Sequence, residues 1–146
     1  MQHVNIFTQV SSKSPKETDG KVIYLLETII NGKEVTSHEI ADVKENWNGA
    51  SLEAILRALR RLRYPCEVVI WTENPYVEMN IDRAKEWRED NYAMRNKKGE
   101  IVPDKKRAHW EKWDEILKIL EEHDYKITSG KNAYTHWLIS ELKRAC

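Results

Sequence analysis

The six residues from Cys66 to Trp71 (CEVVIW) constrain the fold most, because they form a near-continuous apolar run of strand length. Such a run is typical of a central strand that is buried on both faces. The segment before it has a helical period, in which Leu52, Ile55 and Leu59 share one face and a Tyr-Pro pair then ends the helix. This succession predicts an α/β fold.

Three strands are predicted before that helix. Val4 to Val10 is short and apolar, and Lys21 to Ile30 is rich in β-branched residues. Asn31-Gly32 is a strong hairpin signal because both residues accept positive φ, and a third strand is expected from about Glu34 to Val43. A helical crossover then separates the third strand from the Cys66 strand, so we expect these two strands to be parallel.

The second half of the chain continues the alternation of helices and strands. A helix is expected up to about Tyr92, followed by a polar and basic stretch over 93–107. An amphipathic helix from Trp110 to Leu120, a short strand from Tyr125 to Thr128 and a closing helix from Ala133 to Arg144 complete the order βββαβααβα. We find no repeat or linker, so a single domain over residues 1–146 is expected.

Composition excludes several classes of protein. Lys plus Arg and Asp plus Glu each number 24, so nucleic acid can be attracted only by a local cluster of positive charge. Hydrophobic residues make up 40% and charged residues 33%, which fits neither a disordered chain nor a membrane protein. Cys66 and Cys146 form no disulfide framework, and nothing suggests export, so a cytoplasmic protein is expected.

Two segments, together with the element order, resemble the type 1 ribonuclease H family. Cys66 to Val77 (CEVVIWTENPYV) resembles the family's central strand and its Thr-Asp-Ser-x-Tyr-Val segment. Asn46 to Leu62 (NWNGASLEAILRALRRL) resembles the first helix with its Asn-rich approach, and Glu86 to Trp110 resembles the basic protrusion. The resemblance implies a ribonuclease H-like α/β fold, in which helices flank a five-stranded mixed sheet of three antiparallel strands followed by parallel strands.

The resemblance also implies a nuclease chemistry in which four carboxylates hold two Mg²⁺ ions about 4 Å apart. The matching candidate catalytic positions are Thr8 in the first strand, Ser51 in the first helix, Glu73 after the central strand and His136 in the last helix. A shift of one residue would replace Ser51 by Ala50. Only Glu73 is acidic.

These substitutions predict weak Mg²⁺ or Mn²⁺ binding at Glu73, or none. Glu53 does not replace the carboxylate missing at Ser51, because two helical residues rotate a side chain by about 200°. Glu73 has one methylene more than the aspartate that the family carries at this position, and the geometry of Mg²⁺ binding is demanding. The neutral imidazole of His136 cancels none of the positive charge of a metal ion. The loop from Thr128 to Asn132 (TSGKN) also lacks the family's histidine. The sequence therefore predicts a degenerate active site and leaves open whether the protein is an enzyme.

The stretch over 93–107 is the candidate nucleic-acid surface, because its six basic side chains face only two acidic ones. The alternative is a solvated loop. The candidate phosphate contacts are Lys97, Lys98, Lys105 and Lys106.

Four further residues match family positions that contact a hybrid duplex: Asn48, Asn74, Trp87 and Tyr92. Amides at such positions read 2′-hydroxyls and base edges in the minor groove. Structural alternatives stay open for three of them, since Asn48, like Asn46, suits a helix N-cap and the two aromatic rings suit a core. The match at Asn74 is weaker, because Pro75 follows where the family often has an amide donor. Helical spacing assigns Trp110, Trp113 and Trp137 to the core.

Three functions stay open. The first is a protein that binds an RNA/DNA hybrid or another duplex with lost or strongly reduced cleavage. The second is an active metal-dependent hybrid endoribonuclease. The third is a non-catalytic scaffold for an unidentified protein partner.

Overall fold

The protein, seen in a computed structural model, is described over all residues from Met1 to Cys146. Its elements are β1 (Gln2–Val10), β2 (Thr18–Ile30), β3 (Lys33–Glu45), α1 (Trp47–Leu59), β4 (Cys66–Thr72), α2 (Pro75–Glu89), β5 (Ala93–Arg95), β6 (Ile101–Lys106), α3 (Trp110–Leu120), β7 (Asp124–Ser129) and α4 (Thr135–Ala145). All the helices and strands expected from the sequence are present, with bounds shifted by a few residues.

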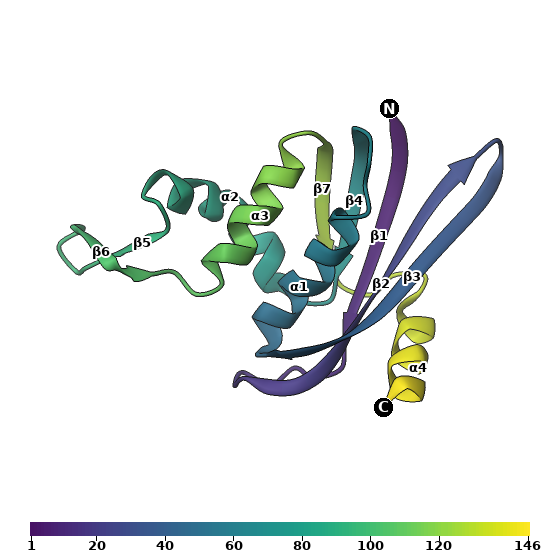
Figure 1. Cartoon of the computed structure of the whole chain (residues 1–146), viewed down its shortest axis with the longest axis horizontal. Helices are drawn as coiled ribbons and strands as arrows, with labels where there is room; N and C mark the ends of the chain where they lie inside the picture. The colour runs from purple at the N-terminus through teal and green to yellow at the C-terminus, as the bar shows by residue number, and fades with distance from the viewer.

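A five-stranded mixed sheet carries the fold, in the order β3-β2-β1-β4-β7 (Figure 1). β1, β2 and β3 form an antiparallel meander, and β4 and β7 continue the sheet in parallel with β1. Asn31 and Gly32 join β2 to β3 with φ values of 51° and 77°, as the hairpin signal predicts. The predicted ribonuclease H-like sheet is confirmed.

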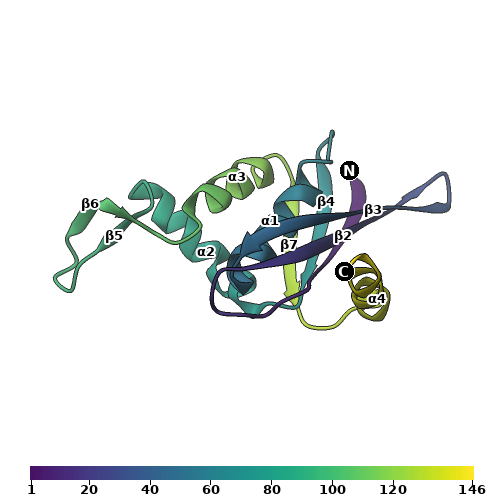
Figure 2. The ribbon, with the colours of Figure 1, turned by 60° about the horizontal axis from the view of Figure 1, so that its bottom comes forward.

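Helices cover the two faces of the sheet unequally. α1, α2 and α3 pack on one face over a cluster that includes Ile6, Val68 and Ile70. α4 lies on the other face, where Leu138 and Leu142 pack against β1 and β2 (Figure 2). Because α4 does not extend over β4, alternate residues of that strand are only half-buried or exposed, and the expected burial of β4 on both faces is wrong.

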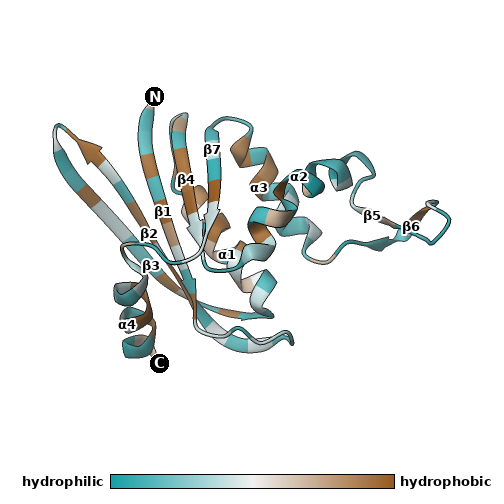
Figure 3. Cartoon of the chain, turned by 180° about the vertical axis from the view of Figure 1, so that it is seen from behind, coloured by the Kyte–Doolittle hydropathy of each residue, from teal (hydrophilic) through white to brown (hydrophobic).

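Residues 93–107 contain a hairpin that the sequence did not predict. β5 and β6 pair antiparallel and form a separate two-stranded sheet that projects from the body (Figures 1 and 2). Its residues are mostly hydrophilic (Figure 3), so they carry no alternating apolar signal. The hairpin corresponds in position to the expected basic protrusion.

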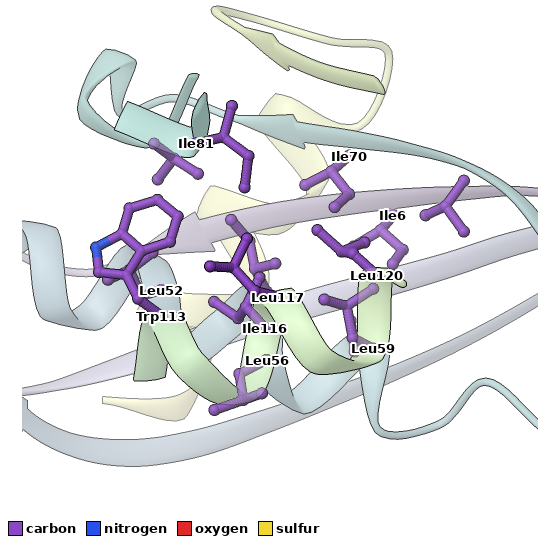
Figure 4. Packing of buried hydrophobic residues seen from close by; sticks show 14 of the residues in the cluster. Ile6, Leu52, Leu56, Leu59, Ile70, Ile81, Trp113, Ile116, Leu117 and Leu120 are labelled. Carbon is purple, nitrogen blue, oxygen red and sulfur yellow. The ribbon is translucent and has the colours of Figure 1, made fainter. Parts of the chain in front are cut away.

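The large cluster under α1 and α3 is the main core (Figure 4). Trp113 is fully buried in it, and its indole Nε1 donates a hydrogen bond of 3.0 Å to the Tyr76 hydroxyl. Trp110 is half-buried at the edge of the same cluster. Trp137 is 38% exposed on α4, so its expected place in the core is wrong. None of the helices is both long and apolar enough to span a membrane.

Trp113→Ala is expected to lower the free energy of unfolding by about 3–5 kcal/mol, because it opens a cavity in the main core and removes the partner of Tyr76. Trp137→Ala is the matched control and should cost about 1 kcal/mol or less, since the ring is partly solvated. Urea unfolding followed by far-UV circular dichroism measures both. Equal losses for the two variants would contradict this assignment of the core.

Candidate active-site cleft and nucleic-acid surface

A small cleft lies where β1 and β4 end beside the N-terminus of α1. β1 and β4 are adjacent and parallel, with Phe7 opposite Trp71, so the residues that follow each strand emerge at the same edge of the sheet. The cleft is lined by Thr8, Gln9, Val10, Trp47, Ser51, Thr72, Glu73 and Asn74. Three of the four candidate catalytic positions therefore lie together.

Glu73 is the only acidic side chain that lines the cleft. The Gln9 side-chain amide donates a hydrogen bond to one carboxylate oxygen, and the Lys13 ammonium forms an ion pair with the other. Burial alone raises the pKa of Glu73, but these contacts, with the nearby charge of Lys131, hold it below its ordinary value. The carboxylate is thus ionised and already has a cationic partner.

Gln9, rather than Thr8, lies against Glu73. The Thr8 hydroxyl is buried and donates a hydrogen bond of 2.8 Å to the Trp71 carbonyl oxygen. Sequence reasoning missed Gln9, although the parallel register of β1 and β4 places it level with Glu73. It also missed Lys13, which reaches the cleft from the loop after β1 and carries no local signal in the sequence.

A hydrogen-bonded network joins α1 to the start of α2. The Asn74 amide nitrogen donates to Asn48 Oδ1 at 2.9 Å and to Ser51 Oγ at 3.2 Å, while its Oδ1 accepts from the Tyr76 amide. Asn74 is only 2% exposed and caps α2, so its side chain is committed inside the protein. Asn46 caps α1. Asn48 is half-buried, and its amide nitrogen makes no hydrogen bond within the protein.

His136 does not join the cleft. It lies in the first turn of α4, its side chain is exposed, and it does not line the pocket at Glu73.

The base of the β5–β6 hairpin is fixed by three of its basic residues. Arg95 forms two hydrogen bonds with the Asp90 carboxylate, of 2.9 and 3.0 Å. Lys106 donates to the Asn91 carbonyl oxygen and lies over the Trp110 ring. Arg107 lies over the Trp87 ring, 5.1 Å from its centroid. These cations stabilise the hairpin.

The other three basic residues, Lys97, Lys98 and Lys105, are exposed and form no ion pair. The predicted set of four lysines is therefore divided, with Lys106 half-buried and engaged within the protein. Three unpaired ammonium groups on one projecting hairpin suit contacts with phosphates.

The two candidate aromatic contacts have different environments. Tyr92 is 2% exposed and its hydroxyl donates to Asp114 at 3.0 Å, so its expected place on the binding surface is wrong. Burial and the Asp114 carboxylate raise the pKa of Tyr92. Trp87 is half-buried and packs edge to face against Trp113, with ring centroids 6.3 Å apart.

Comparison with known sequences places the chain among ribonucleases H. Ribonuclease H of Legionella pneumophila (strain Corby) is 30% identical over 113 residues, which cover 77% of this chain and 76% of that protein. The chain belongs to the ribonuclease H family. Ribonuclease H of Caldicellulosiruptor saccharolyticus is 27% identical over 93 residues, 62% of this chain and 59% of that protein. No protein-family model matches the chain.

Solved structures of ribonucleases H share the fold. LC9-RNase H1, described as a type 1 RNase H with the type 2 active-site motif, superposes over 99% of this chain and 70% of its own with a TM-score of 0.71 and 14% identity. The foamy viral protease-reverse transcriptase in complex with RNA/DNA hybrid matches 97% of this chain and 19% of its own, with a TM-score of 0.60 and 14% identity. Both confirm the fold at low sequence identity.

The metal pair implied by the ribonuclease H family does not fit the side chains present. No group of three or more His, Cys, Asp or Glu side chains is placed to hold a metal ion. Two Mg²⁺ ions need several hard anionic oxygens to offset their mutual repulsion. This ribonuclease H-like cleft offers one carboxylate, already paired with Lys13, and the neutral groups of Gln9 and Ser51.

The variant Glu73→Gln tests the charge state of Glu73 through the pH dependence of the free energy of unfolding. Because the pKa of Glu73 is lowered in the folded protein, the carboxylate adds stability above the unfolded carboxyl pKa of about 4.3. That contribution is lost as the pH falls through the folded value. The variant should be less stable by at most about 1 kcal/mol at pH 7, since Lys13 is half exposed.

Urea unfolding of both proteins at pH 7, 5 and 3 measures this difference. We expect it to be equal at pH 7 and 5 and to shrink at pH 3. A difference that grows on acidification would contradict the lowered pKa of Glu73.

Proposed function

We propose that this member of the ribonuclease H family binds RNA/DNA hybrid duplexes without cleaving them. One observation carries the proposal: the only carboxylate of the cleft, Glu73, is paired with the Lys13 ammonium and the Gln9 amide. A cleft with this set of donors supplies too little negative charge to hold two Mg²⁺ ions. The two-metal hydrolysis of a phosphodiester therefore lacks its cations.

The β5–β6 hairpin supports the binding half of the proposal. Lys97, Lys98 and Lys105 are exposed, unpaired and carried on one projecting element, whereas the whole protein has no net charge. Contacts between lysines and phosphates are insensitive to sequence and weaken as salt is added. The fold match to a reverse transcriptase bound to RNA/DNA hybrid makes this duplex the first ligand to test.

Asn48 is the proposed contact with the RNA strand. It lies in the first turn of α1 beside the cleft, and its Oδ1 is held by Asn74 while its amide nitrogen stays without a partner. An amide held in this way can donate to a 2′-hydroxyl, the group that distinguishes RNA from DNA. Asn74 then positions Asn48 instead of touching the duplex.

The alternative of an active endoribonuclease needs a carboxylate from outside the cleft. Glu53 is nearest in sequence to Ser51, but it forms ion pairs with Arg57 and Lys112 on another face of α1. We therefore favour binding without cleavage.

Neutralising the free lysines of the hairpin is expected to weaken hybrid binding. In the triple variant Lys97→Ala, Lys98→Ala, Lys105→Ala, the plot of log Kd against log salt should flatten by roughly 0.9 for each phosphate that a lysine no longer neutralises. Fluorescence anisotropy with a labelled RNA/DNA hybrid, measured at several KCl concentrations, gives the affinity and the slope.

The matched control removes three lysines that are also exposed and unpaired but lie away from the hairpin, in Lys33→Ala, Lys126→Ala, Lys143→Ala. The two triple variants have the same net charge. If both weaken binding equally, the hairpin is not the binding surface, and if neither does, Lys97, Lys98 and Lys105 do not contact the duplex.

A further inference from the structure

Lys13 is held in the cleft by groups from three elements. Its ammonium pairs with Glu73 after β4 and lies 5.7 Å from the centroid of the Trp47 ring at the start of α1. Gln9 at the end of β1 holds the other oxygen of the same carboxylate. The cation is thus fixed in position, yet the Lys13 side chain is 54% exposed. An ammonium has three donors, so it can contact Glu73 and still donate to a ligand.

The loop that carries Lys13 is anchored without this ion pair. The Ser11 amide donates to the Lys21 carbonyl oxygen at 2.9 Å, and the Trp47 amide donates to the Ser14 carbonyl oxygen at 2.8 Å. The Ser11 hydroxyl also accepts from the Lys21 amide at 2.8 Å. Backbone contacts on both sides of Lys13 therefore position the loop, and the ammonium is not needed to hold it.

The charge of this cleft suits a phosphate directly. One carboxylate, Glu73, is balanced by Lys13, and Lys131 acts on the same carboxylate from the loop before α4. A cluster of four carboxylates would repel a phosphate until metal ions had bound, whereas the single carboxylate of this cleft is already balanced by the Lys13 ammonium. A phosphate group could thus approach the ammonium without any divalent cation.

We propose that Lys13 is a phosphate-binding residue of the cleft, a cation built into the chain at the place where the family binds metal ions. The inference rests on the proposed function, because the phosphate belongs to the bound hybrid duplex. It adds that Lys13 contacts the duplex and that binding at the cleft does not require divalent metal.

The test compares hybrid affinity in EDTA with affinity in Mg²⁺ at matched ionic strength, for the wild type and three single variants. Wild-type affinity should be the same in both buffers. Lys13→Ala should weaken binding roughly threefold to tenfold and flatten the salt slope by about 0.9. Lys13→Arg keeps the charge and should retain most of the affinity. Lys16→Ala, an exposed and unpaired lysine of the same loop, is the matched control and should bind like the wild type.

The outcomes separate this inference from the proposed function. If the wild type binds the hybrid but Lys13→Ala behaves like Lys16→Ala, the role of Lys13 is overturned and hybrid binding stands. Affinity that rises in Mg²⁺ would overturn the metal-independent contact. A wild type that does not bind the hybrid overturns both proposals. Circular dichroism should show that every variant is folded. Calorimetric titration of the wild-type protein alone with Mn²⁺ should give no binding heat. Mn²⁺ binding at Glu73 would count against a built-in cation.

Discussion

The parallel pairing of β1 with β4 is the constraint on which the sheet and the cleft both depend. It joins the antiparallel meander to the parallel strands and forms the part of the sheet against which α1 and α3 pack. The same register places Gln9 beside Glu73, because each lies two residues after the pair formed by Phe7 and Trp71. A slip of one residue would turn every side chain of the slipped strand to the opposite face of the sheet.

Charge balance explains how this fold can keep a cleft without its carboxylates. Several neighbouring carboxylates repel one another and need cations to offset their charge. The single carboxylate of Glu73 needs only one cation, which is the ammonium of Lys13. Ser51 and Asn74 replace charge by hydrogen bonds that join α1 to α2. The charge of Glu73 is thus balanced within the protein, by the Lys13 ammonium and the Gln9 amide.

The fold could be predicted because its signals are local. The apolar run of β4, the Asn31-Gly32 turn and the helical stripe of α1 each predicted one element, and the crossover rule predicted that β3 and β4 run parallel. The five-stranded mixed sheet followed from the resemblance to the ribonuclease H family. The β5–β6 hairpin escaped prediction because β5 is only three residues long, and because the hairpin is supported by distant contacts such as that of Tyr92 with Asp114.

The site was predicted less fully, because its chemistry depends on contacts between distant residues. Glu73 and Ser51 follow from matching a motif along the chain, but the contact of Lys13 with Glu73 spans 60 residues and starts in a loop. The burial of Tyr92 and the engagement of Lys106 likewise depend on packing around α3. Sequence alone could count the charges of the hairpin but not tell the free ones from those already paired.

The most direct test of the central claim is one incubation of the purified protein with an end-labelled RNA/DNA hybrid, first with Mg²⁺ and then with Mn²⁺. A native gel reports retention of the hybrid, and a denaturing gel reports cleavage of the RNA strand. We expect the hybrid to be retained with its RNA strand intact in both metals. Cleavage products that disappear in Glu73→Ala would contradict this expectation, because they would show that the cleft still performs metal-dependent hydrolysis.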